Sequence, residues 1–269
     1  MGTVVFKISV GFVTCALILL AISLYLSSRY LEEQLRLAET GNLEGAREEI
    51  QRAARLDPFS PVPPASEAYL ELRQGRTEAA AQAFQEAIDR DPGNYNNWVA
   101  LGDLQRQRLG DPAAAAESYR EALSRNPHAT AVVSRFAETL LRTEEYEEAR
   151  AQYEWLRERG QISFTDLYRL GKLQVRFGEP EEAVGTFAEA KKSASAGLES
   201  MSEQRRAERV TFIESLDLSI ADALILQGSY AEAREVLSQS EAEQAPAVLA
   251  LLDEDPESYR RSVLDAPIS

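Results

Sequence analysis

The 269-residue sequence contains a single cysteine and a single histidine. These counts exclude a disulfide framework within one chain, a zinc site built from Cys and His, and a c-type haem attachment motif. The 14 glycines include no glycine-rich phosphate-binding loop. Positive charge is also scarce, because 29 Lys and Arg stand against 44 Asp and Glu, which gives a net charge of −15. A field of that sign repels phosphate backbones, so we expect no nucleic acid partner.

Charge is entirely absent from residues 8–28, close to the N-terminus. As a helix rising about 1.5 Å per residue, the stretch 8–26 would be about 28 Å long, which matches the hydrocarbon thickness of a bilayer. Tyr25 stands near the end of this stretch, where aromatic rings favour the membrane interface. A cleaved signal peptide has a similar composition, but its apolar core is shorter. We therefore predict an uncleaved transmembrane anchor in residues 1–28, with lipid contact through residues 8–26 and with Cys15 as an inert thiol facing the membrane.

The orientation of this anchor is not decided by its flanking charges. Lys7 and the amino terminus precede the apolar run, and Arg29 and Arg36 follow it. Two positive charges on each side leave the positive-inside rule without a preference. The remainder of the chain has no cysteine, which is compatible with an oxidising compartment. We expect this soluble part on the extracytoplasmic side, at the periplasmic or outer face of a bacterial membrane.

The rest of the chain repeats one pattern at intervals of 34 or 35 residues. Each copy has a small residue, a large apolar residue four positions later and a second small residue three positions after that. Asp-Pro or Asn-Pro usually follows, and a glycine stands upstream of the block. The blocks are Ala46, Ile50, Ala53 and Pro58; Ala80, Phe84, Ala87 and Pro92; Ala115, Tyr119, Ala122 and Pro127; and Ala183, Phe187 and Ala190; the glycines are Gly41, Gly75, Gly110, Gly178 and Gly228.

This pattern resembles the tetratricopeptide repeat, a pair of antiparallel helices with small residues where the two helices touch. The resemblance implies an all-α fold, namely a right-handed solenoid of about six helix pairs behind one N-terminal transmembrane helix. We expect the solenoid in residues 29–247 and a capping helix with a tail in residues 248–269. The expected repeats are 27–60, 61–94, 95–129, 130–163, 164–197 and 214–247, of which the first, fourth and sixth are degenerate.

Three local features modify this plan. No Gly or Pro occurs from Ser27 to Thr40, so the anchor is expected to run into the first repeat helix without a break. Asp111 and Pro112 add one residue to the third copy, and we expect a longer loop there. The run 191–209 is too long for a linker between repeats, and its composition predicts a helix extension.

Candidate catalytic and metal-binding groups are nearly absent. His128 follows Asn-Pro in a turn between repeats, where we expect it to be solvated. With Cys15 in the membrane, no Cys–His or Ser–His pair remains for nucleophilic catalysis. The acidic cluster at 144–148 is interpreted as a solvated helix start that the helix dipole favours, rather than as a metal site. We therefore predict a protein that is not an enzyme, with no catalytic residues, no cofactor and no metal.

The resemblance also implies a concave groove lined by the first helix of each pair. Four copies carry an arginine near the end of that helix. These arginines suggest a row of guanidinium groups, an arginine ladder, that binds carboxylates. Arginine is favoured at a helix C-terminus by the dipole alone, so this ladder stays a hypothesis. The Lys and Asn clamp of chaperone-binding members is not matched, because Leu31 and Leu35 hold the corresponding positions of the first copy. The groove residues implied are Tyr69, Arg73, Asn96, Asp103, Arg106, Arg142, Tyr168, Lys172 and Arg176.

Three functions fit these features. The first is a membrane adaptor that scaffolds or assembles a membrane or envelope complex by binding proteins or peptides in its groove. The alternative is a permanent structural subunit of a large membrane complex, held by its anchor helix and by the outer solenoid surface. An organellar import receptor has the same layout and is a more distant third possibility. In each case the partners are proteins or peptides, together with the lipid bilayer.

Overall fold

The computed structural model describes residues 2–264, and it describes side chains from residue 13 to residue 263. The described residues form helices and turns without a β-strand. The chain divides into two compact units, Met1–Val132 and Val133–Ser269. The helices that lie in the first unit are α1 (Gly2–Glu39), α2 (Leu43–Leu56), α3 (Val62–Arg73), α4 (Thr77–Arg90), α5 (Tyr95–Leu104), the π-helix η1 (Gln105–Leu109) and α6 (Pro112–Arg125).

The second unit begins within α7 (Thr130–Arg142). Its further helices are α8 (Tyr146–Glu158), α9 (Phe164–Arg176), α10 (Pro180–Ser195), the short 3₁₀ helix η2 (Leu198–Ser200), α11 (Glu203–Gln227), α12 (Tyr230–Gln239), α13 (Ala245–Glu254) and α14 (Pro256–Leu264).

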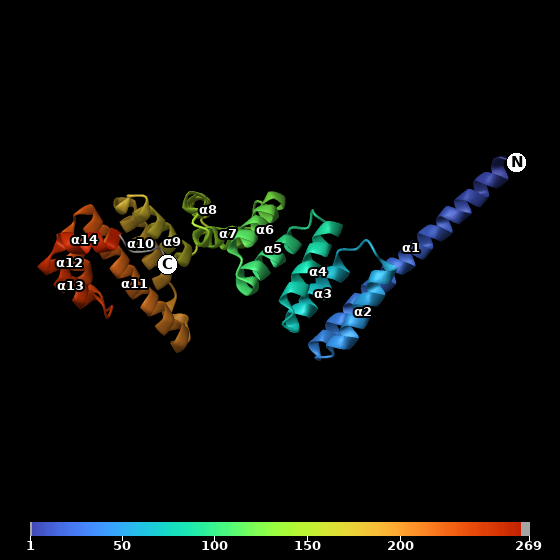
Figure 1. The fold of residues 1–269 in the computed structure, drawn as a ribbon, viewed down its shortest axis with the longest axis horizontal. Coiled ribbons are helices and arrows are strands. Elements are labelled where there is room, and N and C mark those ends of the chain that lie inside the picture. The colour runs from blue at the N-terminus through green and yellow to red at the C-terminus, as the bar shows by residue number, and fades with distance from the viewer. Residues whose placement is uncertain (1, 265–269) are drawn as a thin grey trace. The chain divides into compact units, whose positions relative to one another are not determined.

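Consecutive helices pack in pairs within each unit (Figure 1). In the first unit α1 contacts α2, α3 contacts α4 and α5 contacts α6, while α2 also contacts α3 and α4 contacts α5. In the second unit α10 lies between α9 and α11, and α12 contacts both α11 and α13. Each helix thus contacts mainly its neighbours in the chain, as expected for stacked repeats, and the predicted all-α fold of helix pairs is confirmed.

The repeated small and large residues form the core of each pair. The first small position is fully buried in every copy, including the degenerate ones at Ala149 and Ala233. The large residue four positions later is also buried. Small side chains let two helices approach closely, and the large residue fills the space beside them. The buried large residues are Ile50, Phe84, Tyr119, Tyr153, Phe187 and Leu237.

The turn inside most pairs depends on a residue with positive φ. Gly75, for example, has φ of 73° and ends the first helix of its pair, a conformation that glycine adopts without steric cost. In the fourth pair this position is held by Glu144, with φ of 62°, the one described residue other than glycine with positive φ. The chain therefore makes the same turn there at the cost of local strain.

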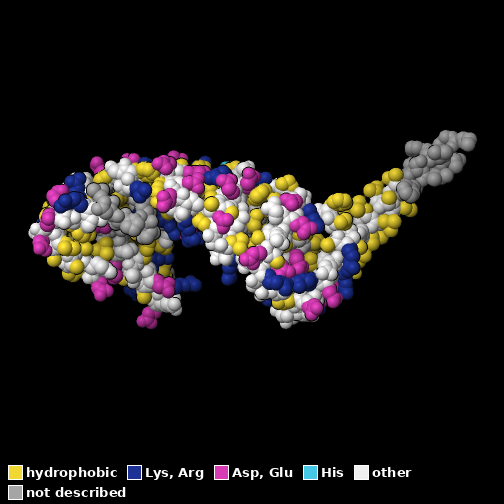
Figure 2. All heavy atoms as spheres, viewed as in Figure 1, with side chains coloured by type: hydrophobic (Ala, Val, Ile, Leu, Met, Phe, Trp, Pro, Cys, Tyr) yellow, Lys and Arg dark blue, Asp and Glu magenta, His cyan; other side chains and the backbone are white. Residues whose placement is uncertain are grey.

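The first helix runs without interruption from the apolar segment into the first pair, as the sequence predicts. Val13–Glu39 of α1 is long and apolar enough to cross a membrane, and 6% of its most apolar window is buried in the protein. Cys15 is exposed on this helix. In the part of α1 whose side chains are described, hydrophobic side chains cover the helix up to the point where it joins the rest of its unit (Figure 2).

The region after the last repeat forms α13 and α14, at the two places where apolar residues follow prolines. The α14 helix contacts α11, and the Tyr259 hydroxyl donates a hydrogen bond to Asp222 at 2.9 Å. The predicted helix extension over residues 191–209 is present only in part. The α10 helix ends at Ser195, the chain turns at Gly197, which has φ of 74°, and the 25-residue helix α11 begins only at Glu203. Residues 265–269 of the expected tail lie outside the described part.

Candidate protein-binding surface

A pocket of about 240 Å³ lies in the first unit, between the first helices of two successive pairs. The α3 helix begins with two prolines in its first turn. The α5 helix is capped by Asn94, the residue before it, whose side chain accepts a hydrogen bond from the Asn96 N–H. These caps fix where both helices start and therefore which side chains face each other. The pocket is lined by Tyr69, Leu72, Phe84, Ala100, Asp103, Leu104, Gln107 and Arg108.

An aromatic pair forms one wall of this pocket. The rings of Tyr69 and Phe84 meet edge to face, with centroids 5.1 Å apart and planes at 86°. Phe84 is buried, while the Tyr69 residue is 56% exposed. Burial raises the pKa of Tyr69, and the charge of Asp103 raises it further. The hydroxyl of Tyr69 therefore stays protonated and can donate a hydrogen bond to a ligand.

The polar side of the pocket is organised around Asp103. The Tyr119 hydroxyl donates to Asp103 Oδ1 at 2.6 Å, and Arg106 Nε donates to that hydroxyl at 3.3 Å. Burial raises the pKa of Tyr119, and the hydrogen bond to Asp103 adds to this shift. Arg106, which the repeat register places in the groove, is thus held by its own helix pair through Tyr119.

The π-helix Gln105–Leu109 explains which side chains reach the pocket. Gly110 follows it with φ of 65°, and the Asp111 N–H donates to the Gln105 carbonyl at 3.0 Å. The extra residue of the third copy is therefore taken up inside the helix, and the expectation of a longer loop is wrong. The wider turn of the π-helix accommodates the inserted residue, so Gly110 still ends the helix as the turn glycines of the other pairs do. Gln107 and Arg108 line the pocket as a result.

In the second unit, two predicted groove arginines already have partners. Arg142 forms an ion pair with Glu138 at 3.3 Å. The Arg176 guanidinium lies over the Tyr146 ring, 4.1 Å from its centroid. Arg142 is exposed and Glu138 is partly exposed, and such an ion pair is weak, so Arg142 can exchange Glu138 for a ligand carboxylate at small cost.

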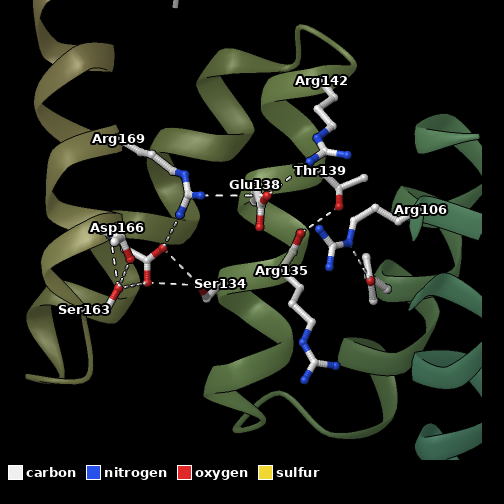
Figure 3. Close-up of polar contacts among 11 residues, drawn as sticks. Arg106, Ser134, Arg135, Glu138, Thr139, Arg142, Ser163, Asp166 and Arg169 are labelled. Atoms are coloured by element: carbon white, nitrogen blue, oxygen red, sulfur yellow. Dashed lines mark hydrogen bonds and ion pairs between the residues drawn. The ribbon is translucent and has the colours of Figure 1, made fainter. Parts of the chain in front are cut away.

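A buried carboxylate joins two first helices of the second unit (Figure 3). Asp166, on α9, accepts hydrogen bonds from Ser134 on α7 at 3.0 Å and from Ser163 at 2.7 Å. Arg169 donates to Asp166 at 3.3 Å and lies 3.8 Å from Glu138. This network satisfies Asp166 internally and fixes the relative position of the two helices, so we assign it a structural role.

The aromatic residues on α9 also pack within the protein. Tyr168 contacts the rings of Phe187 and Phe212, with centroids 5.9 Å and 5.7 Å away. Lys172 lies near enough to Asp222 for its charge to lower the pKa of that carboxyl, although burial raises the pKa overall. Tyr168 and Lys172 therefore face α11 as well as solvent.

The structure brings together two of the nine predicted groove residues, Tyr69 and Asp103, in one pocket. Arg73 and Asn96 are exposed on the helices that form it, and Arg73 has no ion pair with a described residue. The repeat pattern did not predict Gln107 and Arg108 as pocket residues. The extra residue in the third copy was the one feature of the sequence that could have indicated them. The four arginines belong to two different units, so the ladder stays a prediction.

The described side chains offer little for catalysis. Among residues 13–263, no group of three or more His, Cys, Asp or Glu side chains is placed to hold a metal ion. His128 is exposed in the turn after α6, as expected for a solvated turn residue. The arrangement of an aromatic wall, one carboxylate and cationic side chains is suited to binding a ligand.

Comparison with known proteins agrees with this arrangement. Two models of the tetratricopeptide repeat match residues 66–130 and 107–161. No curated protein sequence matches the chain significantly.

Solved structures share the fold, and two of the following three are described as tetratricopeptide-repeat proteins. One from Parabacteroides merdae is 17% identical, covers 89% of this chain and 90% of its own, and has a TM-score of 0.55. The protein YrrB is 18% identical, with a TM-score of 0.53 over 62% of this chain and 86% of its own. The MamA protein is 15% identical, with a TM-score of 0.53 over 62% of this chain and 91% of its own.

Proposed function

Because this chain carries tetratricopeptide repeats, which typically mediate protein–protein interactions, we propose that it binds partner proteins or peptides without catalysing a reaction. We further propose that it is a single-pass membrane protein that scaffolds or assembles a membrane or envelope complex. Its apolar helix α1 is the anchor, and the repeats lie on the extracytoplasmic side. The partners are other membrane or envelope proteins, or peptide segments of them.

The pocket between α3 and α5 is the observation that carries this proposal. It combines an apolar wall at Tyr69 and Phe84 with polar groups at Asp103, Gln107 and Arg108. Pockets that bind peptides have this composition, because apolar area supplies affinity and a few polar groups supply orientation. YrrB, which has the same fold, is described as a repeat protein with an unusual peptide-binding site.

The charges near the pocket favour a ligand with a carboxylate. Arg73 ends α3 and forms no ion pair with a residue whose side chain is described, and Arg108 is exposed at the pocket rim. A guanidinium binds a carboxylate through two parallel hydrogen bonds, which are stronger than bonds between neutral groups. We therefore propose a segment that places an apolar side chain against Tyr69 and an acidic side chain next to Arg73 or Arg108.

The test starts from the protein purified from its native membrane in mild detergent, with the co-purifying proteins identified. Three variants are then compared for retention of the same partner. The pocket variant carries Tyr69→Ala and Arg73→Glu, the anchor variant has α1 replaced up to residue 22 by an unrelated transmembrane helix, and the control carries Lys192→Glu and Arg261→Glu. Both control residues are exposed and lie on helices other than α3 and α5.

We expect the pocket variant to lose the partner and the other two to keep it. Higher salt should weaken the wild-type complex, because the contacts that we propose are ionic. Loss of the partner in the anchor variant alone would contradict binding in the pocket. That result would instead favour a structural subunit that is held through its membrane helix.

A further inference from the structure

The end of α2 is attached to the apolar part of α1. Ser23 Oγ donates to the Leu56 carbonyl at 2.7 Å, and Ser27 Oγ donates to the Ala53 carbonyl at 3.2 Å. Both serines belong to the uncharged segment 8–28. The second helix of the first pair therefore ends beside the apolar segment rather than beyond it (Figure 1).

This attachment fixes the depth of the α2–α3 connection relative to α1. Ser23 precedes the end of the uncharged segment at Ser28 by five residues, which is about 7.5 Å along a helix. With α1 across a bilayer, Leu56 and the connection after it thus lie at the boundary between hydrocarbon and headgroups. The connection comprises residues 57–61, between α2 and α3.

The hydrogen bond to Leu56 suits such a position. The last four carbonyls of a helix have no donor within the helix and usually bind water. Near the hydrocarbon, water is scarce and an unpaired carbonyl is costly. Ser23 supplies the missing donor from α1 itself, so the end of α2 can lie against the membrane without an orphan carbonyl at Leu56.

The connection exposes apolar side chains at this level. Phe59 is 86% exposed, more than any other large apolar side chain in the described part of the chain. Val62, at the start of α3, is 47% exposed. Arg55, one turn before Phe59, is exposed and has no ion pair with a described residue. Exposed apolar side chains next to a basic side chain are typical of segments that enter the interfacial region of a bilayer.

The other repeats of the first unit provide an internal comparison. Three connections make the same turn, closed by a backbone hydrogen bond of 3.3 Å from the residue three positions after Asp57, Asp91 or Asn126. The residue that corresponds to Phe59 is Gly93 in the second connection and His128 in the third. The exposed aromatic ring is therefore found in the one connection that lies against α1, and the turn itself does not require it.

We propose that the connection 57–61 and Val62 form a membrane-contact loop, in which Phe59 and Val62 insert into the bilayer interface while Arg55 meets lipid phosphates. The bilayer that binds this loop is the one that α1 crosses, so the inference rests on the anchor in the proposed function. The first unit is then held at two points, and it cannot rotate freely about α1.

The experiment measures depth in the full-length protein, reconstituted in vesicles of phosphatidylcholine and phosphatidylglycerol. Cys15 is replaced by serine, and single cysteines carry an environment-sensitive fluorophore. The test position is Phe59→Cys and its matched control is Gly93→Cys, the same turn position one repeat later. Leu20→Cys, exposed on α1, reports the anchor. Thr40→Cys, directly after the end of α1, lies about 25 Å from Ser23 along the helix direction. Quenching is compared among the four, with lipids that are spin-labelled near the glycerol for positions 59, 93 and 40. Lipids that are spin-labelled near the end of the acyl chain are used for position 20, which would lie near the bilayer centre.

We expect several-fold stronger quenching at positions 20 and 59 than at positions 93 and 40. If position 20 is quenched and position 59 is as weakly quenched as position 93, the loop lies in water and the inference is wrong, while the anchor stands. If position 20 is not quenched, α1 does not cross the bilayer, and both the anchor and the inference fail.

A second measurement introduces a negative charge into the loop at position 59. With the fluorophore at Val62→Cys, adding Phe59→Asp should lower quenching several-fold, because a carboxylate does not enter the interface. The same change at the matched position, Gly93→Asp, should leave the quenching at position 62 unaltered. Equal quenching in all three proteins would overturn the role of Phe59.

Discussion

Gly171 lies directly against the ring of Phe187, so closely that a Cβ atom on Gly171 would come within 2.5 Å of Phe187 Cε1. The same relationship holds in the third pair, where a Cβ on Gly102 would come within 2.9 Å of the Tyr119 ring. Real Cβ atoms do not approach other carbons so closely, so the two helices of each pair would have to move apart. Glycine at this position sets the distance between the helices.

Gly171→Ala should therefore destabilise the protein by about 1–3 kcal/mol, because it overpacks a helix contact. Gly185→Ala is the matched control, since a Cβ there meets nothing within 4 Å. Alanine at position 185, within α10, should stabilise the protein by up to about 1 kcal/mol through helix propensity. Urea unfolding of the purified proteins in detergent, followed by circular dichroism, measures both changes. Equal effects at the two positions would contradict the close packing of Gly171.

Glu144→Gly should stabilise the protein by about 0.5–1 kcal/mol, because glycine adopts positive φ without the strain that a Cβ causes. Glu147→Gly, in the first turn of α8, removes the same charge and should be destabilising. The comparison of unfolding midpoints separates the effect of φ from the effect of charge. A loss of stability in both variants would show that the Glu144 side chain contributes more than its backbone strain costs.

Asp222 should make stability depend on pH. Burial raises the pKa of its carboxyl, against the Tyr259 hydrogen bond and the Lys172 charge, which lower it. A carboxyl with a raised pKa in the folded state binds a proton more readily there than in the unfolded state. Its charge therefore costs stability above that pKa, and the cost disappears as the pH falls towards the ordinary range of an aspartate.

Asp222→Asn keeps an acceptor for Tyr259 and removes the charge. We expect it to be more stable than the wild type at neutral pH, with a difference that shrinks as the pH falls. Thermal melts at several pH values measure this difference, with Glu254→Gln, at an exposed position of α13, as the control. A less stable Asn variant at neutral pH would mean that attraction to Lys172 outweighs the burial of the carboxylate.

Deletion of Gln107 should convert the π-helix at 105–109 into a regular α-helix. The helix content and the melting temperature should not fall, because the deletion removes an irregular turn. Binding of the partner should fall, because the side chains that line the pocket change. Circular dichroism and a pull-down with the identified partner test the two parts separately. A marked loss of stability would show that the wide turn is required for the fold.

The sequence predicted the helix pairs well because each repeat is specified locally. Ala80 and Phe84 identify a contact within one pair, and no distant residue is needed to place them. Even the degenerate fourth copy was found, since Ala149 and Tyr153 keep the pattern and are fully buried. The unbroken course of α1 was equally clear, because no Gly or Pro interrupts it.

The pocket was predicted less well, for reasons that are also local. The register places Arg106 in the groove, but its side chain donates to Tyr119. The wide turn after α5 could not be seen in the sequence, because a one-residue insertion is equally compatible with a longer loop. Which side chains pair, and whether an inserted residue widens a helix turn or lengthens a loop, depends on small energy differences among similar conformations. The repeat pattern does not encode these differences.

The π-helix at Gln105–Leu109 also has an evolutionary consequence. In an α-helix, one added residue rotates every following side chain by about 100° about the helix axis, which would disrupt the packing of a repeat. Here the disturbance is confined to a single turn, and Gly110 still ends the helix. A lineage can thus exchange the residues that face a partner through one codon insertion, while every buried alanine downstream keeps its place.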